Sequence, residues 1–141
     1  MERFSLSDEY LVGNKLLDAQ HQVILSSMAK VYTYLLAEKK DKDTFDLIDR
    51  LDMYCKLHFL EEEKVMEQMG YLEIEAHKAQ HALFVTHMGN FIGRYEELNS
   101  VKNIDGLLFL KVWFLEHIDS FDKKYVEFNL RLNLGLFDPI E

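Results

Sequence analysis

The stretch LDMYCKLHFLEEEKVM, residues 51–66, decides the fold class because its buried side must follow a helical period. Five residues that suit an inward face recur at intervals of three or four: Leu51, Cys55, His58, Glu62 and Met66. This spacing places them on one side of a helix, whereas a strand would divide them between two faces. The inward face therefore carries an imidazole and a carboxylate among apolar side chains. A buried carboxylate is costly unless an ion or hydrogen bonds compensate its charge.

The same helical period continues over four long stretches, with apolar positions recurring at three and four rather than at two. We predict helices at about residues 15–39, 43–69, 73–99 and 104–133. Helices of this length joined by short connections pack antiparallel, so we expect an all-α, up-down-up-down four-helix bundle that forms one domain over residues 1–141.

Residues 1 to about 14 are expected to form an irregular N-terminal arm. Four of its apolar side chains could cover one side of the bundle: Phe4, Leu6, Tyr10 and Leu11.

Polar residues and glycines mark the expected helix ends. Gly70 supplies a stop for the second helix, and Asn99-Ser100 follows the third. Short polar side chains that can cap a helix start occur before the second and fourth helices: Asp43 or Thr44, and Asn103 or Asp105. The fourth helix is expected to end before Gly135 and Pro139.

Composition excludes several classes of protein. The formal charge is -9, from 25 acidic and 16 basic residues, and no basic stripe opposes it, so nucleic acid is not expected as a partner. Charged residues interrupt every apolar segment, so no membrane span is expected. The first five residues lack the apolar run of a secretory signal, and Cys55 is the only cysteine. These absences favour a reducing cytoplasm.

Histidines are the informative feature of the chain. His58 and Glu62 are four residues apart, and His77 and His81 have the same interval, so each pair projects from one helix face. His21 stands alone on the first helix. His117 and Asp122 are five residues apart, an awkward interval on an α-helix because it turns about 140°. The two can share a centre if Asp122 approaches from the flank, or if the helix is locally overwound or bulged.

Each of these residue patterns has an ordinary structural explanation when it is taken alone. A lone histidine on an apolar stripe is usually a satisfied core residue, a His-Glu pair is often a surface pair, and one His-x-x-x-His is a weak signal. Ligand-type side chains on inward stripes of all four helices are most simply explained together by metal.

Four motifs then make the chain resemble the hemerythrin family, in its bacterial form. They are Asp18-Ala19-Gln20-His21, His58-Phe59-x-x-Glu62-Glu63-x-x-Met66, His77-x-x-x-His81-x-x-Phe84 and Trp113-x-x-x-His117-Ile118-x-x-x-Asp122-x-x-Tyr125, and they occur in family order.

The resemblance implies a non-haem di-iron centre with an oxo or hydroxo bridge. It implies that His77, His81 and His117 bind one iron and that His21 and His58 bind the other. Glu62 and Asp122 would bridge the pair, and the two-histidine iron would keep one open position for dioxygen. Its function would be reversible dioxygen binding, for carriage, storage or sensing, rather than catalysis.

Two alternatives stay open at this point. One is a di-iron redox enzyme, such as a peroxidase, a nitric oxide reductase or an oxygen-consuming oxidase. The other is an iron-storage or regulatory module. Any electron supply or signalling output would need a separate redox or signalling protein partner.

Residues near these ligands have less specific roles. Pocket or supporting positions are expected for Ile24, Phe59, Phe84, Trp113 and Tyr125. His87 lies six residues past His81 and is expected at the surface. Glu61 and Glu63 suit solvent or supporting roles, Asp18 suits a helix cap better than an orienting partner of His21, and Cys55 suits the core.

Overall fold

The first two helices begin at side-chain caps. In the computed structural model, which describes residues 4–132, α1 (Lys15–Leu36) starts where the side chain of Asn14 accepts a hydrogen bond from the backbone N–H of Leu17. Helix α2 (Lys42–Met69) starts at Asp41, whose side chain accepts from the backbone of Thr44. The predicted caps Asp43 and Thr44 are therefore wrong: both lie inside α2, and the Thr44 hydroxyl donates instead to the Lys39 carbonyl.

Gly70 ends α2 as predicted. Its φ of 65° is left-handed, a conformation that glycine adopts without a side-chain clash. Helix α3 (Ile74–Arg94) ends before the expected residue 99.

Helix α4 (Ser100–His117) starts at the cap Asn99, so the predicted starts at Asn103 and Asp105 are wrong. Asn103 is instead a buried residue of α4 whose amide donates to the Tyr95 carbonyl at 2.9 Å. It thereby fastens the connection between α3 and α4.

The chain continues from α4 through the π-helical turn η3 (Ile118–Asp122) into α5 (Lys123–Leu132). The predicted end at residue 133 and the stop residues Gly135 and Pro139 lie outside the described residues.

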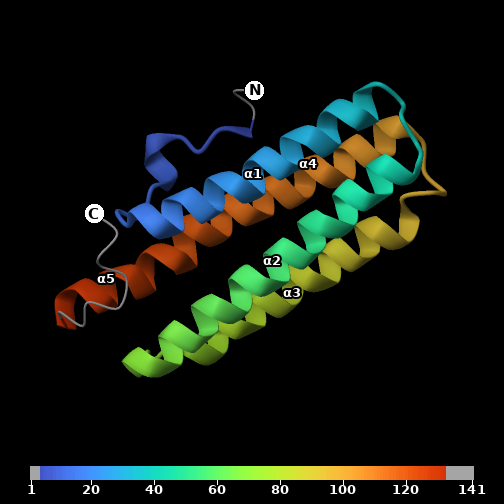
Figure 1. Cartoon of the computed structure of the whole chain (residues 1–141). Coiled ribbons are helices and arrows are strands. Elements are labelled where there is room, and N and C mark those ends of the chain that lie inside the picture. The colour runs from blue at the N-terminus through green and yellow to red at the C-terminus, as the bar shows by residue number, and fades with distance from the viewer. Residues whose placement is uncertain (1–3, 133–141) are drawn as a thin grey trace.

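The helices form the expected antiparallel bundle, in which the chain runs along it four times in alternating directions (Figure 1). Helix α1 packs against α2 and α4, and α3 packs against the same two helices. None of the helices within residues 4–132 combines the length and the apolar character that crossing a membrane requires.

Two apolar clusters fill the interior at different levels along the bundle. The larger contains Ile24, Phe59, Phe84 and Phe114, and the smaller contains Leu17, Met66 and Tyr125. On every helix the inward histidines and carboxylates lie between two levels. On one side of them is a residue of the larger cluster, and on the other side is a residue that belongs to the smaller cluster or packs against it. A layer of buried polar side chains therefore separates two apolar layers.

The N-terminal arm covers the bundle with most of the expected residues. Phe4 is buried in the larger cluster, and Leu6 and Tyr10 pack against it around the short 3-10 turn η2 (Asp8–Tyr10). Leu11 is 41% exposed, so its predicted covering role is wrong. Asp18 neither caps α1 nor orients His21, because its carboxylate accepts from the backbone N–H of Val12 and fastens the arm.

Candidate metal centre

Antiparallel packing brings the candidate ligands to one end of the bundle. His21 lies in the second turn of α1 and His77 in the first turn of α3, whereas Glu62 lies near the end of α2 and Asp122 ends η3. In an up-down-up-down bundle, the starts of α1 and α3 lie beside the ends of α2 and α4. Residues up to about 100 positions apart in the sequence therefore meet.

The turn η3 explains the awkward interval between His117 and Asp122. Its backbone closes from the N–H of Lys123 to the carbonyl of Ile118, five residues earlier, as in a π-helix. The widened turn brings Asp122 back over His117, and Nε2 of His117 lies 3.1 Å from Oδ1 of Asp122. The predicted local bulge is therefore confirmed, and the predicted overwinding is wrong because a π-helical turn is wider than an α-helical one.

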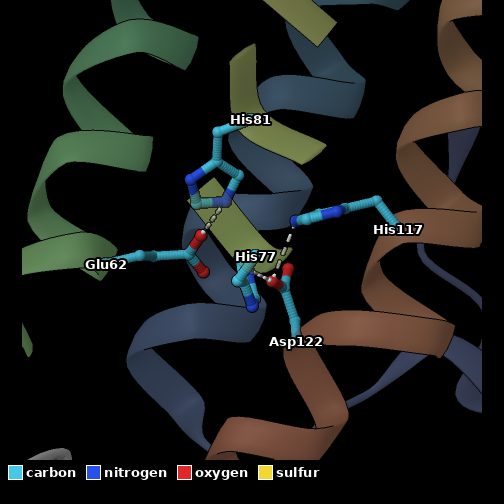
Figure 2. Close-up of side chains that lie close together, drawn as sticks. All are labelled: Glu62, His77, His81, His117 and Asp122. Atoms are coloured by element: carbon cyan, nitrogen blue, oxygen red, sulfur yellow. Dashed lines mark ion pairs between the residues drawn. The ribbon is translucent and has the colours of Figure 1, made fainter. Parts of the chain in front are cut away.

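Seven buried side chains form two overlapping groups with the spacing of metal ligands. The first contains Glu62, His77, His81, His117 and Asp122 (Figure 2), and the second contains His21, His58 and Glu62. Within each group one ligand atom per residue lies within 4.8 Å of every other. All seven predicted ligands are thus brought together, and each is at most 3% exposed.

Asp122 presents its two carboxylate oxygens to different histidines. Oδ1 lies 3.0 Å from Nε2 of His77 and 3.1 Å from Nε2 of His117. Oδ2 lies 3.2 Å from Nε2 of His21. The carboxylate therefore stands between the two histidine groups.

Glu62 has the same two-sided arrangement. Its Oε1 lies 3.2 Å from Nε2 of His81, and its Oε2 lies 3.4 Å from Nε2 of His58 and 3.9 Å from Nε2 of His21. Each carboxylate thus faces the three-histidine group with one oxygen and the two-histidine group with the other.

The inward atoms fit a metal site better than a network of hydrogen bonds. Although the nitrogens and oxygens are close, the atoms that face the centre have no aligned hydrogen-bond partner within residues 4–132: Nε2 of all five histidines, both oxygens of Asp122 and Oε1 of Glu62. Buried polar atoms normally have partners, and such orphans indicate an unplaced ion or water. Imidazole nitrogens with carboxylate oxygens are a donor set that iron accepts.

When no metal is bound, electrostatics favour the ionised form of Glu62 and Asp122 and the protonated form of His21. Burial acts to raise the pKa of Glu62, but the neighbouring imidazoles, His58 foremost, hold it well below its usual range. Burial and the charge of Glu62 raise the pKa of Asp122, yet His117 and His21 hold it well below normal. Burial lowers the pKa of His21, but the carboxylates of Asp122 and Glu62 outweigh that effect and raise it to about 9. A metal ion must displace this proton.

Three side chains support the ligands from outside. Nδ1 of His58 lies 2.8 Å from Oε1 of Gln20, and Nδ1 of His81 lies 2.8 Å from Oε2 of Glu63. The hydroxyl of Tyr125 donates to Oε2 of Glu62 at 2.6 Å. The sequence does not predict this role of Gln20, because only the packing of α1 on α2 reveals its contact.

Aromatic rings lie against both histidine groups, and Phe59 stacks on His81 of the three-histidine group with the ring centroids 4.1 Å apart. Phe114 packs edge-on to His21 at 5.6 Å, and Phe59 lies 5.8 Å from His58. Phe84 contacts Phe59 and Phe114, and Ile24 is fully buried one turn after His21.

Trp113 lies against a different histidine from Phe114. It stacks on His117, of the three-histidine group, and is partly exposed. Sequence reasoning missed its neighbour Phe114, the fully buried ring against His21.

Three residues that were not predicted as ligands lie outside both groups: His87, Glu61 and Cys55. His87 is half-buried rather than fully exposed, with its ring 5.0 Å from that of Phe109. Glu61 is exposed, and Cys55 is buried in the larger apolar cluster.

Comparisons with known proteins agree with this geometry. The family model described as the hemerythrin HHE cation binding domain matches residues 12–128. The chain is 30% identical over 129 residues to the bacteriohemerythrin of Clostridium acetobutylicum, covering 88% of this chain and 99% of that protein. It is 26% identical to the myohemerythrin of Sipunculus nudus, covering 84% and 87%. A solved structure of a hemerythrin mutant superposes with a TM-score of 0.70 at 26% identity, covering 81% of this chain and 86% of that one.

Proposed function

We propose that this chain, which belongs to the hemerythrin family, holds two iron ions with its seven inward side chains. We further propose that it binds dioxygen reversibly at this centre. The observation that carries the proposal is the two-sided placement of Glu62 and Asp122 between the two histidine groups. Carboxylates placed in this way can bridge two metal ions, whereas a single ion would leave one group of histidines without a partner.

The two positions differ in the number of ligands that the chain offers. One has three imidazoles and the other has two, while both share the same pair of carboxylates. A position with fewer protein ligands leaves room for a small external ligand. We therefore place dioxygen at the position held by His21 and His58.

The residues around that position suit a small apolar ligand. Ile24, Phe59, Phe84 and Phe114 are at most 3% exposed and bring no charge to the site. When bound, the two iron ions would supply the electrons that hold dioxygen, and the chain's part is to orient the ions and exclude water. Exclusion of water protects an oxygenated state from side reactions, which favours reversible binding over turnover.

Oxygen cycling tests this function against the enzyme alternative. Iron-loaded, anaerobically reduced protein is exposed to oxygen and then evacuated, while the visible charge-transfer absorbance is followed. We expect the band to appear and disappear over repeated cycles. A single irreversible oxidation would contradict reversible binding and favour a di-iron redox enzyme.

Two histidine variants make that experiment specific to the site. His77→Ala removes an inward imidazole and should abolish the oxygen-dependent band. His87→Ala removes the half-buried histidine outside both groups and should leave the band unchanged. A redox or signalling protein partner and a cytoplasmic location stay predictions.

A further inference from the structure

We infer that Glu63 and Gln20 widen the difference in affinity between the two metal positions: Glu63, acting through His81, raises the affinity of the three-histidine position for a divalent ion. The inference rests on the proposed function, since it concerns the same site. Both residues are positioning residues, because each contacts a proposed ligand rather than the ions.

The hydrogen bonds to Nδ1 set the tautomers of two histidines. A carboxylate oxygen and an amide oxygen are both acceptors, so Nδ1 of His81 donates to Glu63 and Nδ1 of His58 donates to Gln20. In each ring the lone pair of Nε2 is then left facing the centre. Among the residues that the structure describes, Nδ1 of the other three histidines of the site, His21, His77 and His117, has no hydrogen-bond partner. Each metal position thus has one oriented imidazole.

The two acceptors differ in charge. A carboxylate draws the Nδ1 proton more strongly than a neutral amide does, and it makes the imidazole a better electron donor to a cation. The Glu63 side chain is 19% exposed, so water screens this interaction only in part. The negative partner lies on the side that already has three imidazoles.

Two neighbouring lysines each pair with another carboxylate, although the charge of Glu63 also acts on Lys78. Both lysines and Glu63 line one surface groove between α2 and α3, which has a volume of about 450 Å³; the lysines are Lys56 and Lys78. Lys56 pairs with Asp52 and Lys78 pairs with Glu67, each at 3.0 Å. The short contact of Glu63 is therefore the one with the imidazole.

Titration of the metal-free protein with Co²⁺ under anaerobic conditions tests the inference, with calorimetry for affinity and visible absorption for the ligand field. We expect two ions to bind in two steps. Glu63→Gln should weaken the tighter step by about 10–100-fold, the usual effect of losing such a partner, and leave the weaker step unchanged. Glu61→Gln is the matched control, because it makes the same change of charge at an exposed position on the same helix, and it should alter neither step.

A second variant tests the other half of the inference. Gln20→Glu gives His58 a carboxylate partner, so it should tighten the weaker step and narrow the gap between the two affinities. In Zn²⁺-loaded protein, the ¹⁵N resonance of His81 Nδ1 should shift in Glu63→Gln and not in Glu61→Gln.

The outcomes separate the two claims. If the wild-type protein binds fewer than two ions, the proposed function is overturned. If it binds two but Glu63→Gln matches Glu61→Gln, or Gln20→Glu leaves the affinity gap unchanged, the inference is overturned and the proposed function stands.

Discussion

The hydroxyl oxygen of Tyr125 lies 2.6 Å from Oε2 of Glu62, inside the bundle and out of contact with water. This is the carboxylate oxygen that faces His21 and His58. Burial and the charges of Glu62 and Asp122 raise the pKa of Tyr125 well above its usual value. The phenol therefore stays protonated and donates a hydrogen bond to Glu62, whose Oε2 would otherwise lack this hydrogen-bond partner.

Removing that donor should destabilise the metal-free protein. Tyr125→Phe leaves Oε2 of Glu62 without its hydrogen bond, and a hydrogen bond to a charged group contributes about 1.5–3 kcal/mol. Urea unfolding in the presence of a chelator measures this loss. Tyr34→Phe is the control, since Tyr34 is only partly buried and its hydroxyl has no hydrogen bond within residues 4–132, and it should change stability by less than about 0.5 kcal/mol. Equal effects in the two variants would contradict a special role for Tyr125.

The stability of the metal-free protein should fall between neutral and alkaline pH. The pKa of His21 rises from 6.5 to about 9 on folding, so the folded chain holds this proton more tightly than the unfolded chain. The resulting stabilisation is fully present below about pH 6.5 and is lost as the pH rises through about 9, and it is on the order of 3 kcal/mol.

Unfolding in chelator at pH 6, 7.5 and 9 measures that dependence. His21→Gln, which cannot bind the proton, should give a flatter profile. Metal uptake should show the opposite trend, becoming tighter as the pH rises, because the ion replaces the proton. A wild-type profile as flat as that of the variant would refute the electrostatic description of the site.

Cys55 should be unreactive in the folded protein. Burial raises the pKa of its thiol, and the thiolate is the reactive form. A colorimetric thiol reagent should therefore detect no thiol at neutral pH in the native state and one thiol per chain in denaturant. Rapid labelling of the native protein would show that the core near Cys55 opens readily.

Phe114 should affect both stability and oxygen chemistry. Phe114→Ala leaves a cavity beside His21 and should cost about 3–5 kcal/mol of stability. In iron-loaded protein the same cavity admits water, so oxidation of the oxygenated state should accelerate. Phe109→Ala, at a ring that is 52% exposed, is the control and should change neither property appreciably. A normal oxidation rate in Phe114→Ala would mean that this ring does not shield the site.

The sequence is sufficient to predict the bundle and the shared faces of two ligand pairs, because both follow from intervals along single helices. His58 with Glu62 and His77 with His81 share a face whatever the detailed packing. The interval alone does not place Asp122, since the π-turn, which no local residue signals clearly, brings it over His117.

Other features depend on tertiary contacts or on a choice among similar residues. Gln20 meets His58 across two helices, so nothing near it in the sequence reveals that role. Trp113 and Phe114 are adjacent aromatic residues, and only the exact rotation of α4 decides which one lies against His21. Asp43 and Thr44 are predicted as caps of α2, but Asp41, a third short polar residue just before them, is the one at which the helix begins.

Anomalous diffraction at the iron edge, on crystals of the iron-reconstituted protein, tests the central claim most directly. We expect two iron peaks per chain, one bound by His77, His81 and His117 and the other by His21 and His58, with Glu62 and Asp122 in contact with both. A single peak, or iron bound elsewhere while these seven side chains contact only one another, would contradict the account.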